Sequence, residues 1–465
     1  MKPAIIISIP LVWGVRNVVN SGLYDLLETE CDVYIATPPS GVQDMIGLGL
    51  PQDRVINLPI PKSTRIIRIL SKGLKENHYI MKSVLSRKIF TRFRKSDKID
   101  EKFERKIISS FLNPLLKSKQ GYNFFVKLFE NQFSSQINKD FIRKINAIQP
   151  AAALSTSYVH YWEWPLFNYL QNKKIPTATH ILSFDNLTSR GFYPFERFDH
   201  YYTWQQDMSD QLRNFYKISQ SKIKITGTPQ FDFHVSPSLK WDKNKTASKL
   251  GIDPTKPYIA YCANHYAHTP GESQLISVLI EKVREIDRFK DFQWVIRIHP
   301  LDDYSRWNSI FSVYPNVVIS LPWNQNDNSS KWSVPNNDDL ALLSNTLRHA
   351  CCTVTIASTS ALDSCVVDTP IICLGFHPDK GSEEDQYYHD VHYTFHYKPI
   401  VQSGAVDFVS NIEEFLDAFD VIVANPSMKR KEREKLKNHL CGEVDGNSAN
   451  RIAEQFLSLV RQNPI

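Results

Sequence analysis

Clusters of polar side chains follow strand-like runs at several places in the sequence, and their residue types suit phosphates and sugars. One cluster lies in TIASTSALDSCVVDTPIICLGF, where a turn precedes a helix expected over about residues 361–367. The hydroxyls of Ser358, Thr359 and Ser360 could bind a diphosphate beside the helix N-terminus. Asp363 could accept hydrogen bonds from a ribose diol. Ser360 and Asp363 also have the spacing of a capping box, so the local pattern leaves both interpretations open.

A second cluster ends the run WVIRIHPLDD. Arg297 and His299 are two residues apart and therefore lie on the same side of an extended strand. A cationic pair at a strand end suits a phosphate or a leaving diphosphate. The alternative is that both side chains meet a structural carboxylate such as Asp302.

The loop YCANHYAHTPGE offers Asn264, His265, His268 and Thr269 directly after another strand-like run. The two histidines are of a metal-binding type, but a pair three residues apart without a third partner is weak evidence for zinc. Contact with a phosphate or a base is the favoured interpretation for His265.

The first strand-like run continues into PLVWGVRNVVNSGLYDLL. Its glycines allow a tight strand-to-helix turn that carries Arg16 and Asn17, both candidates for the acceptor side of a cleft. An ordinary turn explains the same residues. A G-x-G-x-x-G fingerprint is missing here, so no nicotinamide or flavin cofactor is predicted.

The stretch THILSFDNLTSRG places four hydrogen-bonding side chains just past a strand. Asp185 could act as a general base or orient a sugar hydroxyl, and Asn186 and Thr188 could bind substrate hydroxyls. Arg190 could hold a phosphate. An Asx-turn that merely caps the loop explains Asp185 and Asn186 equally well.

The elements that position these clusters are short apolar runs that alternate with helix-like segments. Because the runs are continuously apolar, they predict parallel strands buried on both faces, and hence an α/β chain with two doubly wound domains. Ligands bind such sheets beyond the carboxyl ends of the strands, where all the clusters fall. The predicted strands are AIIISIP, DVYIATP, RVINLPI, AAALSTS, TATHILSF, HYYTW, KIKITGTP, YIAYCAN, WVIRIHP, NVVISLP, CTVTIAS and IICLGF.

At 465 residues the chain exceeds the size of an ordinary single core. A polar stretch without strands separates the two series of strands and sets the domain boundary near Pro237. We expect a first domain over residues 1–236 with a basic helical insertion over about 61–145, and a second domain over residues 237–445. A helix over residues 446–465 could cross back to the first domain.

The composition, 42% hydrophobic and 22% charged, is that of a globular protein. The apolar runs are shorter than the roughly 20 residues that span a bilayer, and no export signal is visible, so a cytoplasmic location is expected. The 7 cysteines lie mostly in apolar runs and predict reduced thiols in the core.

One segment makes the chain basic. Residues 61–120 contain 17 Lys and Arg against 5 Asp and Glu, a local net charge of +12, so the remaining residues carry +6 − 12 = −6. Aromatic and basic residues at helical spacing could rest on an anionic membrane surface, or could form a solvated face of the domain. Nucleic acid is not a predicted partner, because no familiar binding module is present.

The motifs ITGTPQFD, RIHP, ASTSALDSCVVDTPIICLGF and FHYKPIVQSGAVDFVSNIEEFLDAF, in this order, resemble GT-B-fold glycosyltransferases of bacterial surface-polysaccharide synthesis. SFDNLTSRG resembles their Trp-Asp-Asn-x-Thr-x-x-Gly pattern, with Phe184 in place of Trp. The match covers roughly residues 151–419. The family includes teichoic-acid glycerophosphate transferases and is related in fold to UDP-sugar epimerases.

This resemblance implies two Rossmann-like domains that face each other across a cleft, with a nucleotide-sugar donor on the second and a glycan or lipid-linked acceptor on the first. It assigns the donor phosphates to Ser358, Thr359 and Ser360, and the ribose to Asp363, where the family usually has Glu. The leaving diphosphate falls to His299. Thr228, within ITGTP, joins the donor-binding candidates.

The expected reaction needs neither a bound metal nor a cofactor besides the nucleotide-sugar substrate, since cationic side chains can stabilise a leaving diphosphate. The sequence has no suitably placed Asp-x-Asp, and the adjacent Asp302 and Asp303 point apart if extended. For an inverting reaction, Asp185 is the first candidate base and His160 the second. The alternatives are a CDP-activated glycerophosphate-type phosphotransferase and a non-catalytic nucleotide- or glycan-binding protein.

Overall fold

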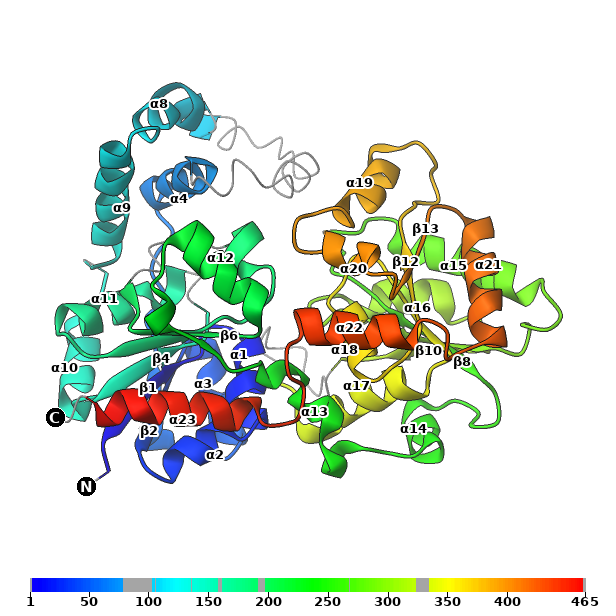
Figure 1. Cartoon of the computed structure of the whole chain (residues 1–465), viewed down its shortest axis with the longest axis horizontal. Helices are drawn as coiled ribbons and strands as arrows, with labels where there is room; N and C mark the ends of the chain where they lie inside the picture. Colours follow the sequence, from blue (N-terminus) through cyan, green and yellow to red (C-terminus); the bar gives the residue numbers. More distant parts are fainter. Residues whose placement is uncertain are drawn as a thin grey trace. The chain divides into compact units, whose positions relative to one another are not determined.

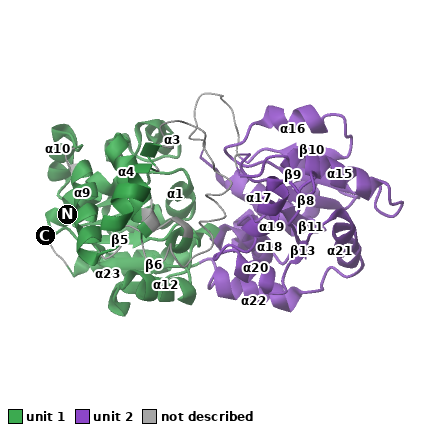
Figure 2. Cartoon of the chain, turned by 90° about the horizontal axis from the view of Figure 1, so that it is seen from above, with its two compact units in different colours: residues 1–87, 94–230, 447–465 green, residues 88–93, 231–446 purple. Residues whose placement is uncertain are grey.

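The computed structural model describes residues 2–77, 103–104, 106–134, 136–157, 161–190, 197–266, 268–322 and 334–462. The chain divides into two compact units, coloured separately in Figure 2. Unit 1 comprises residues 1–87, 94–230 and 447–465, and unit 2 comprises residues 88–93 and 231–446. The chain thus enters unit 2 a few residues before Pro237, and its last helix belongs to unit 1.

In the described part of unit 1, seven parallel strands form one sheet in the order β3-β2-β1-β4-β5-β6-β7 (Figure 1). The order reverses between β1 and β4, which makes the sheet doubly wound. The strands are β1 (Ala4–Ser8), β2 (Asp32–Thr37), β3 (Val55–Asn57), β4 (Ala152–Ser155), β5 (Thr177–His180), β6 (His200–Thr203) and β7 (Ile223–Ile225).

Helices connect these strands, and the terminal helix α23 packs against α2. The described helices of unit 1 are α1 (Trp13–Val15), α2 (Leu23–Glu28), α3 (Val42–Gly47), α4 (Arg65–Asn77), α8 (Asn113–Leu115), α9 (Lys119–Ser134), α10 (Lys139–Ile148), α11 (Trp164–Asn172), α12 (Gln206–Tyr216) and α23 (Ser448–Arg461). Short π-helical turns cover Arg16–Asn20, Ile108–Leu112 and Asn186–Arg190.

Unit 2 has a second parallel sheet, with six strands in the order β10-β9-β8-β11-β12-β13 among its described residues. Here the order reverses between β8 and β11. The strands are β8 (Tyr258–Cys262), β9 (Gln293–Arg297), β10 (Val317–Ser320), β11 (Cys352–Thr355), β12 (Ile371–Leu374) and β13 (Asp407–Val409).

The helices of unit 2 cover both faces of that sheet. Those described are α13 (Asp232–Val235), α14 (Lys243–Leu250), α15 (Glu272–Arg284), α16 (Tyr304–Phe311), α17 (Asn337–His349), α18 (Ser360–Val366), α19 (Glu383–Val391), α20 (Lys398–Gln402), α21 (Ile412–Ala424) and α22 (Arg430–Leu440).

Strand β8 shows why an unbroken apolar run becomes a central strand. Ile259 and Tyr261 point into one hydrophobic core, and Tyr258, Ala260 and Cys262 point into a second core on the opposite face. Because successive side chains alternate between faces, a strand that is buried on both sides must be apolar throughout.

All twelve predicted strands are present, so the predicted α/β, doubly wound fold class is confirmed. Strand β13 was not predicted, because its three residues, DFV, are too short a run to stand out. None of the seven cysteines forms a disulfide, and all but the half-buried Cys351 are buried, in line with the predicted core thiols. No helix in the described ranges combines the length and apolar character that a membrane crossing needs.

Candidate functional site

Ligands bind doubly wound sheets where the strand order reverses, because the connecting loops diverge there at the carboxyl edge. In unit 1 this point lies beyond Ser8 of β1 and Ser155 of β4, and in unit 2 beyond Cys262 of β8 and Thr355 of β11. These two edges are called the unit 1 edge and the unit 2 edge below.

The loops of the unit 2 edge are tied together across the reversal. The side-chain amide of Asn264, after β8, donates to the carbonyl oxygen of Ile356, after β11. The Thr355 hydroxyl donates to the Cys262 carbonyl over 3.0 Å, and the Ser360 hydroxyl lies 3.3 Å from that of Thr355. Two predicted clusters therefore meet at one place.

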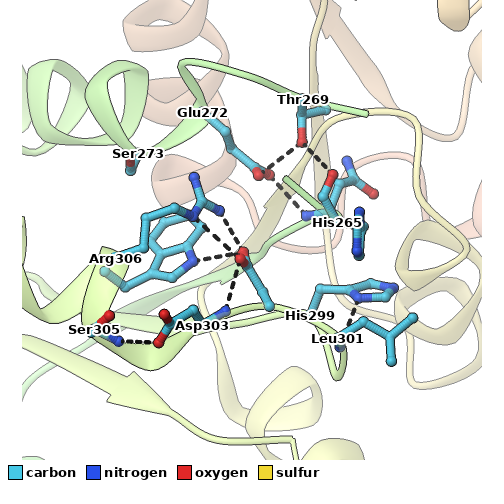
Figure 3. Close-up of polar contacts among 12 residues, drawn as sticks. His265, Thr269, Glu272, Ser273, His299, Leu301, Asp303, Ser305 and Arg306 are labelled. Atoms are coloured by element: carbon cyan, nitrogen blue, oxygen red, sulfur yellow. Dashed lines mark hydrogen bonds and ion pairs between the residues drawn. The ribbon is translucent and has the colours of Figure 1, made fainter. Parts of the chain in front are cut away.

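Glu272, the first residue of α15, holds the loop after β8 in shape (Figure 3). Its buried carboxylate accepts hydrogen bonds from the Tyr261 hydroxyl at 2.6 Å, the Asn264 backbone N–H at 2.9 Å and the Thr269 hydroxyl at 2.9 Å. Burial raises the pKa of Glu272 to about 7, although these donors and Arg306 oppose the shift. The carboxylate is enclosed, so it positions the loop.

Three histidines gather beside this network, and Figure 3 shows His265 near His299. The ring centroids of His265 and His299 are 5.5 Å apart, and those of His265 and His268 are 5.8 Å apart. The predicted clusters after β8 and β9 thus come together. Within the described ranges, no three His, Cys, Asp or Glu side chains are arranged to hold a metal ion.

The charge predicted for His299 needs correction. Burial, reinforced by His265 and His268, lowers the pKa of His299 to about 4, although Asp302 opposes the shift. The ring is therefore neutral near pH 7. Its Nδ1 accepts a hydrogen bond from the Leu301 backbone N–H at 3.1 Å, which leaves the proton on Nε2. His299 is thus a neutral hydrogen-bond donor, whereas the sequence suggested a cation.

Arg297 supplies positive charge from beneath the same edge. Its buried guanidinium donates to the Ser320 hydroxyl at 3.2 Å and to the Leu321 and Pro322 carbonyls at 3.4 and 2.9 Å, which fixes the end of β10. Burial lowers its pKa to about 10, so the group stays charged at neutral pH. Its hydrogen bonds to protein atoms argue against direct donor contact.

Asp302, proposed from the sequence as a structural partner for Arg297 and His299, engages other groups. Its carboxylate forms an ion pair with Arg306 (Figure 3) and accepts a hydrogen bond from the Trp307 indole N–H at 2.9 Å. These donors lower the pKa of Asp302 against the effect of burial. Its hydrogen bonds with side chains therefore go to Arg306 and Trp307, and its effect on His299 is electrostatic.

The turn before α18 is held in an unusual conformation. Ala357 has φ of 21°, in the left-handed region that residues with a Cβ rarely adopt. Its backbone N–H donates to Nε2 of buried His392 over 3.1 Å, and His392 Nδ1 contacts the Tyr388 carbonyl at 2.7 Å. Burial lowers the pKa of His392 to about 4, so its neutral ring can accept this bond. The turn presents Ser358 and Thr359.

A capping box, one of the two interpretations of Ser360 and Asp363, is absent from α18. Thr359 is the N-cap residue and makes no side-chain capping bond, and Ser360 is already the first helical residue. The Asp363 carboxylate instead contacts Nε2 of His234 at 2.8 Å, and Nδ1 of His234 contacts the Ser344 hydroxyl at 3.0 Å. All three residues are buried, so this chain joins α18, α13 and α17 and orients Asp363.

The unit 1 edge also contains a buried glutamate. Glu163 immediately precedes α11, and its carboxylate accepts from the Ser155 hydroxyl and from the Ser157 backbone N–H, the latter at 3.2 Å. Burial raises its pKa to about 7 against these bonds. Nearby, a Cβ on Gly14 of α1 would lie 2.8 Å from the Thr156 hydroxyl oxygen, so α1 needs glycine here to approach the loop after β4.

Asn17 lies on the π-helical turn at this edge and is only 2% exposed. Neither its amide oxygen nor its amide nitrogen has a hydrogen-bond partner among the described residues, and the same holds for the Ser157 hydroxyl. Arg16, its neighbour on the same turn, is half-buried. Buried amides rarely lack partners, so Asn17 is a strong candidate for contact with a ligand.

The SFDNLTSRG stretch follows β5, the strand next to β4. Asn186 accepts from the Ser183 N–H at 3.1 Å and donates to the half-buried Asp185 carboxylate at 3.3 Å. The Thr188 hydroxyl donates to the Asp185 carbonyl at 3.3 Å. Local bonding of the expected kind is therefore present, and Arg190 ends the same π-helical turn.

Two other predicted residues, His160 and Thr228, remain to be placed. His160 lies outside the described residues. Thr228 follows β7, which three strands separate from β1, and its buried hydroxyl accepts from the Gln230 N–H at 3.4 Å. Thr228 belongs to unit 1 and not to the unit that carries the other donor-binding candidates.

Sequence reasoning missed Glu163, Glu272, His234 and His392. One signal for Glu272 was available, because Thr269-x-x-Glu272 has the spacing of a helix-start motif. The partners of His234 and His392 lie far away in the sequence, so no local pattern pointed to them.

Comparison with solved structures identifies the fold. UDP-GlcNAc 2-epimerase from Neisseria meningitidis, bound to UDP-GlcNAc, superposes with a TM-score of 0.56 at 12% identity over 98% of this chain and 100% of the other. The S. aureus MnaA–UDP structure gives 0.55 at 11% identity over 100% and 99%. The glycosyltransferase of kitacinnamycin gives 0.52 at 10% identity over the whole of both chains. The chain therefore has the GT-B fold, as predicted.

No family model matches the sequence. No curated protein matches it either.

Proposed function

We propose that the protein is a glycosyltransferase that moves a sugar from a nucleotide-sugar donor to a glycan or lipid-linked acceptor in surface-polysaccharide synthesis. The observation that supports this best is the unit 2 edge. It combines the imidazoles of His265 and His299, serine and threonine hydroxyls, a buried guanidinium and an oriented aspartate at the strand-order reversal. This set suits a nucleoside diphosphate.

In this proposal the donor phosphates bind the hydroxyls of Ser358, Thr359 and Ser360. Nε2–H of His299 and the ring of His265 donate to the leaving diphosphate, while Arg297 contributes charge from below. The donors are fixed before the substrate arrives, so little reorganisation accompanies the build-up of charge.

Asp363 accepts hydrogen bonds from the ribose diol. One of its carboxylate oxygens already contacts His234, which turns the carboxylate and limits its freedom. A short aspartate in place of the family's usual glutamate reaches less far, and the rigid hold by His234 would partly offset this.

The acceptor binds the unit 1 edge through Asn17, Asn186 and Thr188, and an anionic group on the acceptor would contact Arg16 and Arg190. Asp185 is the proposed base, since its half-buried carboxylate lies just past β5, and His160 is the second candidate. Glu163 is fully buried and acts on the loop after β4, not on the substrate.

Donor identity and bond cleavage test this proposal together. The protein is incubated with UDP-, GDP-, CDP- and CMP-linked donors, with and without acceptor glycans, and the released nucleotide is measured. A glycosyltransferase releases nucleoside diphosphate from a UDP-, GDP- or CDP-sugar, or CMP from a CMP-sugar, in an acceptor-dependent way. Acceptor-dependent release of CMP from a CDP-activated glycerol donor would instead identify a phosphotransferase.

Two further outcomes would contradict transfer. Conversion of a UDP-sugar to its epimer without any acceptor would indicate an epimerase, the activity named for the Neisseria meningitidis protein of similar fold. Failure to bind or convert any donor would favour a non-catalytic protein. A lipid-linked acceptor would place the active enzyme at the cytoplasmic face of the membrane.

A further inference from the structure

Unit 1 carries an exposed apolar surface away from its sheet. The segment formed by the π-helical turn Ile108–Leu112, α8 and the first half of α9, residues 106–127, is called the helical tip. Three of its large apolar side chains are strongly exposed: Phe111 is 71% exposed, Phe124 is 62% exposed and Leu115 is 46% exposed. Figure 1 shows α8 and α9 beside α4 in unit 1.

The segment that carries the exposed side chains is well packed on its other face. The tip buries a separate set of apolar residues, among them Ile108, Leu112 and Leu116. A Cβ on Gly73 of α4 would lie 2.2 Å from a Leu112 methyl carbon, so the tip packs closely on α4. The tip is therefore anchored by one apolar face and presents a second.

The charge around the exposed face is positive. Residues 106–127 include four lysines, Lys106, Lys117, Lys119 and Lys127, and no Asp or Glu, a local net charge of +4. The described acidic side chains nearest the tip in the sequence, Glu104 and Glu130, are buried and neutralised. Glu104 pairs with two basic residues of α4, and Glu130 pairs with Arg197.

Val313 in unit 2 lacks this combination. Its side chain is 77% exposed, but its loop, FSVYPN, contains no lysine or arginine. Single exposed apolar side chains are common on globular proteins, whereas several together with a one-sided charge indicate a binding surface.

We infer that the helical tip docks on an anionic lipid bilayer. Phe111, Leu115 and Phe124 enter the boundary between headgroups and acyl chains, and the lysines lie at the level of the lipid phosphates. A protein partner fits less well, because lysine is depleted at protein interfaces, while its long apolar stem and charged end suit the bilayer interface. The inference does not depend on the proposed reaction.

The test is co-sedimentation of the full chain with vesicles, without any donor. Vesicles of phosphatidylcholine alone are compared with vesicles that also contain phosphatidylglycerol. We expect binding to the anionic vesicles only, weakened by added salt. Phe111→Ser with Phe124→Ser should reduce binding by about 10-fold or more, as loss of two inserted aromatic rings implies. Lys117→Glu with Lys119→Glu should reduce it as well.

Val313→Ser is the matched control, because it removes an equally exposed apolar side chain outside the tip and should leave vesicle binding unchanged. Thermal unfolding of each variant checks the fold. Wild-type protein that stays in solution with anionic vesicles would overturn the inference. So would tip variants that bind like the wild type, or tip variants that only convert an oligomer to a monomer by light scattering.

Discussion

Each of the two edges contains a buried glutamate that fixes a loop, but the residues around the two glutamates differ. In each unit a buried glutamate at the start of a helix accepts a backbone N–H from the loop that follows a strand, together with at least one hydroxyl. For Glu163 the hydroxyl is that of Ser155, and for Glu272 the hydroxyls are those of Tyr261 and Thr269. Burial raises the pKa of both carboxyls to about 7.

The neighbours of the two glutamates differ. Both oxygens of Glu272 accept hydrogen bonds, and Asn264 beside it is bonded through its backbone and its side chain. At the unit 1 edge, the Ser157 hydroxyl and the Asn17 amide have no partner among the described residues. We infer that the unit 2 edge is preorganised for its ligand, whereas the unit 1 edge is completed by the acceptor.

The largest expected effect is at the unit 1 edge. If Asp185 is the base, Asp185→Asn should cut turnover by about 10²–10⁴-fold while donor binding is retained. If Asp185 only shapes the loop, the change should cost little, because Asn forms the same local turns. Single-turnover rates at saturating donor distinguish the two, and near-normal turnover would remove Asp185 as the base.

The buried glutamates predict a shared pH dependence of stability. Between the unfolded pKa near 4.5 and the folded pKa of about 7, the folded protein keeps a proton that the unfolded chain has lost. Stability therefore falls as the pH rises through this interval, by about 3 kcal/mol for each carboxyl. Glu163→Gln and Glu272→Gln should each flatten the dependence.

Urea unfolding across this pH range measures the effect, with the exposed Glu434→Gln of α22 as the matched control. The control should keep the wild-type slope. Glutamine variants that also keep it would show that neither carboxyl is protonated in the folded state, and the likeness between the edges would then be one of geometry alone.

The strands and the fold class could be predicted because a strand that is buried on both faces has a continuous run of apolar residues. The residues Ile259 and Tyr261 on one face and Ala260 on the other are all apolar, and no partner need be known to recognise this. The turn before α18 was likewise predictable from its serines and threonines.

The site itself was only partly predictable, because its contacts join distant segments. His234 and Asp363 are 129 residues apart, and His392 and Ala357 are 35 apart. The neutral charge of His299 depends on burial, which the motif RIHP does not reveal. Glu163 and Glu272 looked like ordinary helix-start residues until their enclosure was known.

Nucleotide binding tests the difference between the edges most directly. Calorimetric titration of the preferred nucleoside diphosphate should show Asp363→Ala weakened by roughly 1–3 kcal/mol, because a charged acceptor of the ribose is lost. Asp363→Asn, which keeps an oxygen for His234, separates this loss from damage to the fold. Asp185→Asn and Asn17→Ala, at the unit 1 edge, should bind the nucleotide like the wild type. Unchanged affinity in both Asp363 variants, or lost affinity in the unit 1 variants, would contradict the assignment of the donor to unit 2.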